Sequence, residues 1–551
     1  MTQNVVALDI ETTTAHDRIW CCSVAFSVEE AITFTEGSKE LQRAIENADI
    51  IVGHNIVFFD APLLEKLWGI SIPSEKIRDT LVLSRLYNPE AKPHSLEAWG
   101  QKLAFSKGDF SDYDSGYSEE MRLYCEQDTK LTWKLYHHLR EAVASGGFSE
   151  ASQELEHDVA RVIAGQERNG FRFNLRASEG LYERLCQRMN EITEELQRKF
   201  PPIVTERYSE KTGKRLKDDV EEFNIGSRQQ IAKRLESLGA NFSRKTENGN
   251  VSVDETVLAE IALPEAQLCA EYLLIQKRVG LIEGWMKAYN KETGRIHGKV
   301  LTNGAVTGRM THHSPNLAQV PATRAPYGEE CRSLFTVEEG NVLVGADASG
   351  LELRMLAHYM QDKSFIDEVV EGDVHTRNME AAGLNDRDTA KTFIYAFLYG
   401  AGSSKIGSIV GGSKNDGAKL KAKFLENTPD LKKLINKVSR IAQQGSVPGL
   451  DGRRLRIRSG HAALNTLLQG AGAIVMKKAL VLLVARLDAR VIPYKMVANV
   501  HDEFQIETPE HYGEAVGINA VKAIREAGEA LELRCPLDGE YKIGLNWAST
   551  H

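Results

Sequence analysis

The stretch VLVGADASGLELR, residues 342–354, constrains the fold of this chain more than any other. Its apolar run ends at Asp347, which indicates a buried strand that carries a carboxylate at its end. Gly350 then allows the chain to turn into a helix. The stretch therefore predicts a strand–turn–helix unit that presents one carboxylate at the edge of a core.

A second carboxylate, Asp502, lies in the stretch VANVHDEFQIE, residues 497–507. Apolar residues on both sides of the His-Asp-Glu triplet predict a hairpin with Asp502 and Glu503 at its tip. Most Asp-Glu pairs are solvated turns, but these apolar flanks hold the pair at the edge of a core. A strand end beside a hairpin tip can bring Asp347 and Asp502 to one point, where they can hold two divalent metal ions.

Between the two carboxylates, the stretch RDTAKTFIYAFLYG repeats a long basic or aromatic residue every four positions. Four residues turn a helix by about 400°, so each side chain lies only about 40° from the last, on one stripe. The alternative is an amphipathic helix with a charged flank. A core stripe should not begin with two cations, however, and a solvated stripe should not end with two tyrosines. The stripe can bind phosphates at one end and stack a base at the other; it consists of Arg387, Lys391, Tyr395 and Tyr399.

Length and composition favour an ordinary protein of several domains. The chain has 551 residues, which suggests three or four domains, and is 42% hydrophobic and 26% charged. No apolar run of about eighteen residues and no ordered secretory signal occur, so we expect no contact with a membrane. The seven cysteines are scattered without a Cys-x-x-Cys pair, which indicates neither a zinc site nor a disulfide scaffold and fits a reducing cytoplasm.

The net charge of −9 argues against indiscriminate binding of polyanions, but it does not exclude a local basic groove. Two clusters of basic residues occur, at 207–217 and at 453–458. Each could line such a groove, or could be a solvated loop and a solvated hairpin. The basic residues are Arg207, Lys211, Lys214, Arg215 and Lys217 in the first cluster, and Arg453, Arg454, Arg456 and Arg458 in the second.

Residues 1 to about 140 alternate short apolar strands with helices, as an α/β unit does, and carry further acidic residues. Asp9 and Glu11 are two apart in a predicted strand and therefore share a face. Tyr124 and Asp128 are four apart on a predicted helix, and Asp60 begins another. An isolated Asp-x-Glu in a strand is usually an ordinary pair of surface residues, but here four carboxylates from three elements can converge. They would repel one another without a cation, and all-oxygen ligands suit Mg²⁺ or Mn²⁺.

The motifs together resemble two known families. DIE, HNIVFFD and YCEQD, in this order, resemble the DnaQ-like 3′→5′ exonucleases, which have an RNase H-like fold. DASGLELR, RDTAKTFIYAFLYG and VHDE resemble the three polymerase motifs of family A (DNA polymerase I-like) DNA polymerases, in wording closest to the replicative phage branch. GAVTGRMTHHSPNLAQVP and HAALNTLLQGAG resemble two further DNA-contact segments of that family. The resemblance covers nearly the whole chain, and we expect no 5′-nuclease domain before Asp9.

The resemblance implies a multidomain α/β and α+β protein, with an RNase H-like exonuclease domain followed by a right-hand polymerase of palm, fingers and thumb. The expected boundaries are 1–145 for the exonuclease, 146–300 for linker helices and thumb, 301–375 for the first part of the palm, 376–455 for the fingers and 456–551 for the second part of the palm.

The resemblance also implies the polymerase site. Asp347 and Asp502 would hold two Mg²⁺ ions, with the Ala348 carbonyl assisting and Glu503 nearby. Arg387, Lys391 and His375 would contact the triphosphate, and Lys391 would be the general acid for pyrophosphate. Arg309 and Gln469 would donate to minor-groove acceptors, which differ little among base pairs, and Tyr399 would stack near the templating base. The residues expected to contact DNA are Arg309, Gln319, Tyr399, Gln469 and His501.

In the exonuclease unit, the resemblance implies that Asp9, Glu11, Asp60 and Asp128 hold two further metal ions and that Tyr124 orients the attacking water. Mn²⁺ is expected to substitute for Mg²⁺ at both sites.

Two residues support sharper expectations. Glu352 lies five residues after Asp347, where the family places a side chain against the sugar 2′ position, so we expect it to exclude ribonucleotides. The alternative is a helix-surface glutamate that pairs with Arg354 or with solvent. Tyr395 occupies a position where some members have Phe, and its hydroxyl can replace the missing 3′-hydroxyl of a dideoxynucleotide.

The expected function is template-directed DNA synthesis from dNTPs on primer–template DNA, with proofreading of the single-stranded 3′ end, in phage replication and therefore in the host cytoplasm. A single-subunit RNA polymerase, a nuclease with an inactive polymerase half and a non-catalytic DNA-binding protein are the alternatives. A helicase or single-strand binding protein would be a partner at the fork. Thioredoxin is not expected, because the region between Phe200 and Phe223 is too short for a docking subdomain.

Overall fold

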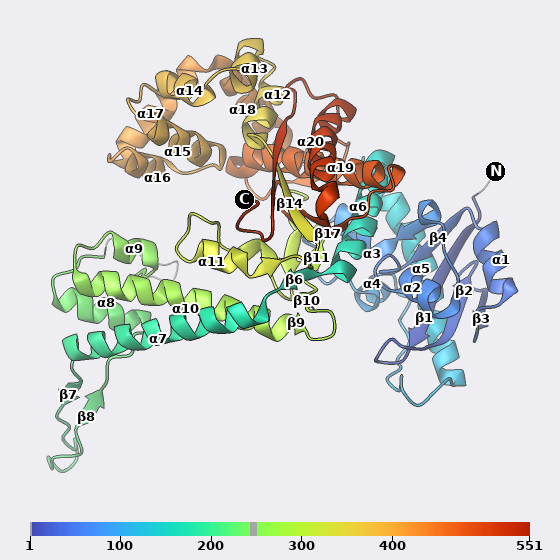
Figure 1. Ribbon diagram of the computed structural model, residues 1–551, viewed down its shortest axis with the longest axis horizontal. Coiled ribbons are helices and arrows are strands. Elements are labelled where there is room, and N and C mark those ends of the chain that lie inside the picture. The colour runs from blue at the N-terminus through green and yellow to red at the C-terminus, as the bar shows by residue number, and fades with distance from the viewer. Residues whose placement is uncertain (1–2, 243–250) are drawn as a thin grey trace.

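The computed structural model describes residues 3–242 and 251–551. An α/β unit at the N-terminal end lies on one side of the molecule, and a helical arm and a separate helical lobe project from the other side (Figure 1). A four-stranded sheet with long helices lies between them.

The N-terminal unit is built on a five-stranded sheet in the order β3-β2-β1-β4-β5. The central strand β1 (Val5–Thr12) is antiparallel to β2 (Ile19–Ala25) and parallel to β4 (Ile50–Gly53). The long helix α5 (Glu119–Ser145) packs across β1 and β2, because its buried side chains recur on one face. The predicted α/β unit is therefore confirmed; its edge strands are β3 (Ala31–Phe34) and β5 (Ile77–Asp79).

Helix α6 (Glu150–Asn169) connects this unit to the helical arm. The arm consists mainly of α7 (Leu175–Lys199) and α10 (Pro264–Ala288), which pack against each other. Asn174 begins α7, since its side chain accepts a hydrogen bond from the Ala177 N–H, and Pro264 occupies the first turn of α10. The arm also contains α8 (Arg228–Ser237), α9 (Glu255–Ala259) and a ribbon of β7 (Ile203–Thr205) and β8 (Asp219–Glu221).

The central sheet has the order β17-β18-β14-β19, with every neighbouring pair antiparallel. The predicted strand at 342–347 is the core strand β14 (Asn341–Ala348), and the predicted hairpin is β17 (Lys495–Val500) and β18 (Glu503–Pro509). The remaining strand is β19 (Gly539–Gly544). Two helices, α19 (Ala463–Ala489) and α20 (Gly513–Ala530), pack against each other beside this sheet.

Helix α19 is a core helix. Within the described residues, one helical stretch, Gly460–Ala489, is long and apolar enough to cross a membrane, but 67% of its most apolar window is buried in the protein. Burial of this kind is what a central helix of a large domain requires.

The helical lobe follows α12 (Leu351–Met360) along the chain. Its helix α15 (Arg387–Leu398) coincides with the predicted stripe and begins where the Asp386 side chain accepts from the Thr389 N–H, at 2.7 Å. The other helices of the lobe are α13 (Lys363–Val370), α14 (Val374–Ala382), α16 (Ser403–Ile409), α17 (Lys414–Asn427) and α18 (Pro429–Ala442).

Candidate active sites

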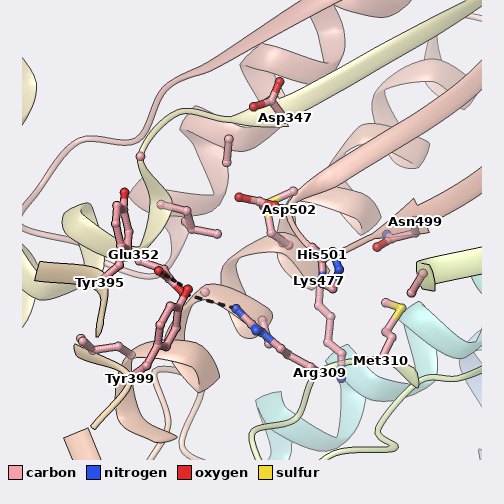
Figure 2. Close-up of a pocket in the computed structure, with 18 of the residues that line it drawn as sticks. Arg309, Met310, Asp347, Glu352, Tyr395, Tyr399, Lys477, Asn499, His501 and Asp502 are labelled. Carbon is pink, nitrogen blue, oxygen red and sulfur yellow. Dashed lines mark hydrogen bonds and ion pairs between the residues drawn. The ribbon is translucent and has the colours of Figure 1, made fainter. Parts of the chain in front are cut away.

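A cleft of about 730 Å³ lies where β14, the β17–β18 turn, α12, α15 and α19 meet (Figure 2). Asp347 and Asp502 both line it. The Ala348 N–H donates to the Asp502 carbonyl at 3.1 Å, so a backbone hydrogen bond joins the strand end to the hairpin turn. In that two-residue turn His501 has a φ of 57°, a conformation that fits the twist of a hairpin. The structure therefore brings the two predicted carboxylates together.

The electrostatics at Asp347 favour a bound cation. Burial raises the pKa of Asp347, and the carboxylates of Glu540, Asp502 and Glu503 raise it further. Glu540 lies directly opposite Asp347 across β14 and β19, and Glu503 lies opposite it on β18. Sequence reasoning missed Glu540, because nothing in the local pattern of β19 shows which strand it will pair with.

Glu503 is held by the protein rather than presented to the cleft. Its Oε1 accepts from Trp547 Nε1 at 2.6 Å, and His551 Nδ1 lies 2.9 Å from Oε2. Burial raises the pKa of Glu503, but His551, Arg332 and Trp547 together bring it below its usual value. The carboxylate is therefore ionised and engaged, and a direct catalytic role for it stays a prediction.

Three of the four residues in the stripe on α15 line the cleft, namely Lys391, Tyr395 and Tyr399. The rings of the two tyrosines are nearly parallel, with centroids 6.5 Å apart. Arg387 lies outside the lining and makes two hydrogen bonds to Asp373, at 2.8 and 3.0 Å. The structure therefore confirms that Lys391, Tyr395 and Tyr399 face the cleft together, whereas Arg387 pairs with an acidic residue outside it.

His375, on α14, lies beside Tyr395, with ring centroids 6.2 Å apart. Burial lowers the pKa of His375, and the cations Lys391 and Arg387 lower it further. His375 is therefore close to the stripe and favours its neutral form.

Glu352 is bound by residues of the cleft. Its carboxylate accepts from the Tyr399 hydroxyl, and its Oε1 lies 3.6 Å from a terminal guanidinium nitrogen of Arg309 (Figure 2). The alternative pairing with Arg354 is wrong, because the Arg354 Nε donates to the Ser349 carbonyl at 2.8 Å. Arg354 is buried, and its guanidinium also donates to the Pro536 carbonyl.

The residues expected to contact DNA are only partly gathered here. Arg309 and His501 line the cleft with Tyr399. Gln469 is half-buried on α19, directly after the lining residue Leu468, and Gln319 is exposed on a short 3₁₀ turn. Sequence reasoning also missed further lining residues, among them Lys477 and His551, which have no local motif to mark them.

The arginine cluster at 453–458 lies on and beside a hairpin of β15 (Ser446–Pro448) and β16 (Arg454–Arg456), which packs against the N-terminal unit. The predicted hairpin is therefore present, but it is only partly solvated: Arg454 is exposed, whereas other members of the cluster contact the protein. Arg458 Nε donates to Glu90 at 2.8 Å, and the Arg456 guanidinium lies 5.9 Å from the centroid of the Tyr87 ring. Arg453 is only 1% exposed.

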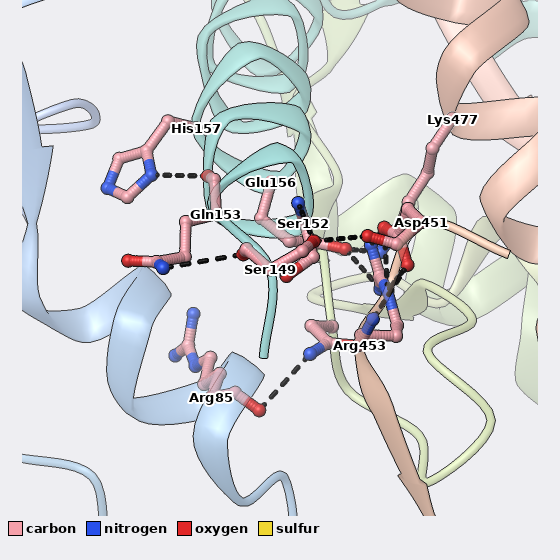
Figure 3. Close-up of polar contacts among 10 residues, drawn as sticks. Arg85, Ser149, Ser152, Gln153, Glu156, His157, Asp451, Arg453 and Lys477 are labelled. Carbon is pink, nitrogen blue, oxygen red and sulfur yellow. Dashed lines mark hydrogen bonds and ion pairs between the residues drawn. The ribbon is translucent and has the colours of Figure 1, made fainter. Parts of the chain in front are cut away.

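Arg453 belongs to a buried ionic network that joins three segments (Figure 3). The Glu156 carboxylate, on α6, contacts both Arg453 and Lys477, each at 2.5 Å. Asp451 accepts from Arg453 at 2.7 Å. Two acids and two bases offset one another, so the network links α6 to α19 without a net buried charge.

A second acidic site lies in the N-terminal unit. Asp9 and Glu11 lie on β1, Asp60 begins the short helix α2 (Asp60–Leu63), and Tyr124 and Asp128 lie on α5. The Ile10 N–H donates to Asp60 Oδ1 at 3.1 Å, which fixes the start of α2 beside β1. The structure thus brings together the carboxylates that the sequence placed on three elements.

Burial and repulsion between neighbouring carboxylates raise the pKa values of the acidic residues at this site. Burial raises the pKa of Glu11 to about 8 and that of Asp60 to about 7. It also raises the pKa of Asp9 well above its usual value, with Asp60, Glu11 and Asp128 adding to the rise. Burial raises the pKa of Tyr124 too, so its hydroxyl stays protonated. Such a set of oxygen ligands fits divalent cations, which would remove the repulsion.

Two residues of this site were missed from the sequence. Cys125 lies so close to Asp9 and Glu11 that one potential ligand atom from each of the three falls within 4.8 Å of the others. The Lys107 ammonium lies 3.0 Å from Asp128 Oδ2. Cys125 is three residues before Asp128 on the same helix, which is a usable signal, whereas Lys107 lies in an irregular loop that gives none.

Comparison with known proteins adds sequence relatives. A family model described as DNA polymerase family A matches residues 186–549. The DNA-directed DNA polymerase of Escherichia phage T7 is 36% identical, with 93% of this chain and 94% of that protein covered. The corresponding enzyme of Enterobacteria phage T3 is 35% identical over the same shares. DNA polymerase I of Geobacillus stearothermophilus is 27% identical, with 75% of this chain and 48% of that protein covered.

Among solved structures, the POL domain of Pol1 from M. smegmatis, in complex with DNA primer-template and dNTP, superposes with a TM-score of 0.81. The likeness covers 99% of this chain and 95% of that chain at 18% sequence identity. The two chains therefore share a fold, which confirms the predicted fold class. The family model begins at residue 186, after the N-terminal acidic site.

Proposed function

This chain belongs to DNA polymerase family A and is a template-directed DNA polymerase, and from this premise we propose that its cleft joins a dNTP to a primer 3′-hydroxyl. The observation that carries the proposal is the arrangement across the cleft. Asp347 and Asp502 lie on the sheet side, and Lys391 and Tyr395 lie on the helix α15. An acidic pair facing a cation and two rings suits a triphosphate with a base attached.

The two carboxylates fit a pair of Mg²⁺ ions, or Mn²⁺ in their place. A backbone hydrogen bond from the Ala348 N–H to the Asp502 carbonyl holds the two chain segments together. Burial and then repulsion from neighbouring carboxylates raise the pKa of Asp347, and a cation would relieve that repulsion. The Ala348 carbonyl would assist them. When bound, such ions lower the pKa of the primer hydroxyl and neutralise charge on the triphosphate.

The residues of α15 supply the remaining chemistry. The primer 3′-hydroxyl releases its proton to solvent, its oxygen forms a bond to the α-phosphorus, the bond from that phosphorus to the bridging β-phosphate oxygen breaks, and pyrophosphate leaves. Lys391 donates a proton to the leaving pyrophosphate, since its ammonium faces the cleft. Arg387 exchanges Asp373 for the triphosphate, because a more highly charged anion competes for the same guanidinium. His375 binds the phosphates next to it.

Selection of the sugar falls to Glu352 and Tyr395. Glu352 is held in the cleft by Tyr399 and Arg309, where it excludes a 2′-hydroxyl. Burial and then the carboxylates of Glu352 and Asp502 raise the pKa of Tyr395, so its hydroxyl stays protonated beside the acidic pair. That hydroxyl replaces the missing 3′-hydroxyl of a dideoxynucleotide.

We propose that residues 1–145 form a 3′→5′ exonuclease domain. Asp9, Glu11, Asp60 and Asp128 would hold two divalent ions there, and the protonated hydroxyl of Tyr124 would orient the attacking water. The clustering of the four carboxylates supports this role. The same primer end would then be extended at one site and shortened at the other.

The same proposal identifies the DNA ligands and the protein partners of this chain. The M. smegmatis structure holds primer-template DNA and dNTP, and we propose the same ligands here, with a single-stranded 3′ end at the exonuclease. Arg309, Gln319, Tyr399, Gln469 and His501 would contact the DNA. The enzyme would act in phage replication in the host cytoplasm, beside a helicase or single-strand binding protein. Thioredoxin would not be a partner, because the segment between α7 and α8 contains only the short ribbon β7–β8.

The test of this function is extension of a labelled primer with dNTPs and, separately, with NTPs. We expect rapid template-directed extension with dNTPs and at least about 100-fold slower extension with NTPs, the scale at which a well-placed group discriminates between substrates. Equal rates would indicate an RNA polymerase-like enzyme. No extension, with DNA binding intact, would indicate a binding protein.

A further inference from the structure

Lys107 extends from an irregular loop into the carboxylate cluster of the N-terminal unit. The loop connects α4 (Leu96–Lys102) to α5, and Lys107 Nζ lies 3.0 Å from Asp128 Oδ2. The same ammonium lies 5.1 Å from the centroid of the Tyr124 ring. The Lys107 side chain is 30% exposed, whereas that of Asp128 is 4% exposed, so the lysine enters the site from its solvent side.

The loop is fixed on both sides of Lys107. Gln127 donates to the Ser106 carbonyl at 2.7 Å. On the other side, a Cβ at Gly108 would lie 2.7 Å from a ring carbon of Tyr124, so the backbone approaches that ring more closely than other residues permit. The ammonium can therefore shift by side-chain rotation while its backbone remains beside the site.

Lys107 is a counter-ion for the cluster. Among the described residues, it is the cation that lowers the pKa of Asp9, of Glu11 and of Asp128, against the larger effect of burial. A divalent ion would do the same work more strongly. The Lys107 ammonium occupies Asp128 Oδ2, so a metal ion bound to Oδ1 would lie beside that ammonium on the same carboxylate. Two cations on one carboxylate repel each other, so a bound metal favours movement of the ammonium away from Asp128.

A DNA 3′ end bound at this site would bring a phosphate as a new anionic partner for the displaced ammonium. We propose that Lys107 occupies Asp128 when the site holds no metal, and that it moves onto a non-bridging oxygen of the scissile phosphate when the metal and DNA are bound. This inference rests on the proposed exonuclease function.

The reaction that Lys107 would assist is hydrolysis of the terminal phosphodiester. A water oxygen forms a bond to phosphorus, the bond from phosphorus to the 3′-oxygen breaks, and a proton released by the water ends on that 3′-oxygen. The products are a nucleoside 5′-monophosphate and a shortened primer with a 3′-hydroxyl. Lys107 keeps its proton throughout and donates a hydrogen bond to the phosphate oxygen as negative charge grows on it.

Two measurements test the proposal on the full chain. The first is Mn²⁺ binding by calorimetry, with Asp347→Asn and Asp502→Asn in every protein so that titration reports the N-terminal site. We expect Lys107→Met to bind Mn²⁺ about tenfold more tightly, which is the scale of a neighbouring charge. Lys107→Arg should keep the affinity close to that of the parent. The matched control is Lys102→Met, because Lys102 is exposed on α4 outside the cluster.

The second measurement is degradation of single-stranded DNA at saturating Mn²⁺. We expect Lys107→Met to be about 100-fold slower, as for loss of one donor to a developing oxyanion, and Lys107→Arg to retain most of the rate. Tighter binding together with slower turnover is a result that a merely structural lysine would not give.

Unchanged Mn²⁺ affinity in Lys107→Met would overturn the displacement, and an unchanged rate at saturating metal would overturn the phosphate contact. A protein with intact Lys107 that binds Mn²⁺ but degrades no DNA would refute the exonuclease function itself. In that case the Mn²⁺ affinities still decide whether Lys107 competes with the metal. Thermal melting in EDTA identifies a variant that fails to fold. If Lys107→Met fails to fold, Lys107→Arg is compared with the parent protein in its place.

Discussion

The Tyr399 hydroxyl lies 2.6 and 2.7 Å from the two carboxylate oxygens of Glu352. This contact joins the C-terminal end of α15 in the helical lobe to α12 beside the central sheet, within the lining of the cleft. It also fixes the orientation of the carboxylate that we propose as the barrier to ribonucleotides. The role of Glu352 can therefore be tested by substituting Glu352 itself or by substituting Tyr399.

Glu352→Ala should therefore weaken the preference for dNTPs over NTPs by about 100-fold, because the side chain that blocks the 2′-hydroxyl is gone. Tyr399→Phe should weaken it less, since Glu352 keeps its Arg309 neighbour. Single-nucleotide incorporation with matched dNTP and NTP measures both. An unchanged preference in Glu352→Ala would show that the carboxylate is not the barrier.

Tyr395→Phe should restore discrimination against chain terminators. The tyrosine hydroxyl lies in the cleft, where it can take the place of a missing 3′-hydroxyl, and phenylalanine has no such group. We expect the ratio of dNTP to ddNTP incorporation to rise by about 100-fold or more, the range reported for loss of a buried hydrogen-bonding partner. Equal ratios in the two proteins would contradict this role.

The acidic cluster predicts a pH dependence of stability without metal. The folded-state pKa of Glu11 is about 8 and that of Asp60 about 7, both above their unfolded values. The folded state therefore binds more protons than the unfolded state, so stability falls as pH rises from about 5 to about 8. Thermal melting in EDTA should show this fall, and Glu11→Gln should reduce it. Excess Mg²⁺ at pH 8 should raise the melting temperature of the unmodified protein, and a melting temperature independent of pH would refute the account.

The buried network of Glu156 predicts a large loss of stability. Glu156→Ala would leave Arg453 with only Asp451 and would leave Lys477 without its carboxylate partner, at a cost of about 3–5 kcal/mol. Urea denaturation measures this cost. The control is Glu154→Ala, an exposed residue two positions earlier on α6, which should change stability by less than about 0.5 kcal/mol. Equal effects of the two substitutions would show that the network contributes little.

The sequence was sufficient where a local pattern carried the information. The apolar run before Asp347, the flanks of Asp502 and the four-residue period of α15 each predicted the observed element. It was insufficient where the partner of a side chain comes from far along the chain. Glu503 accepts a hydrogen bond from Trp547, which lies 44 residues away, and no helical or strand pattern in the sequence predicts that contact.

The same limit applies to charged side chains whose burial depends on packing between units. Arg453 looks like part of a solvated cluster in the sequence, but its carboxylate partner Glu156 lies on a helix about 300 residues earlier. The sequence around Lys107 has no pattern that marks it as a site residue, because Lys107 lies in an irregular loop. Its role depends on the fold, which places Asp128 of α5 beside its ammonium group.

Primer extension with Mg²⁺ on three proteins, the unmodified chain, Asp502→Ala and Asp9→Ala, distinguishes the two proposed sites. We expect Asp502→Ala to lose synthesis but still degrade the primer from its 3′ end. We expect the reverse for Asp9→Ala, which should extend the primer and no longer shorten it. Continued synthesis by Asp502→Ala, or unchanged degradation by Asp9→Ala, would contradict the assignment of two separate sites.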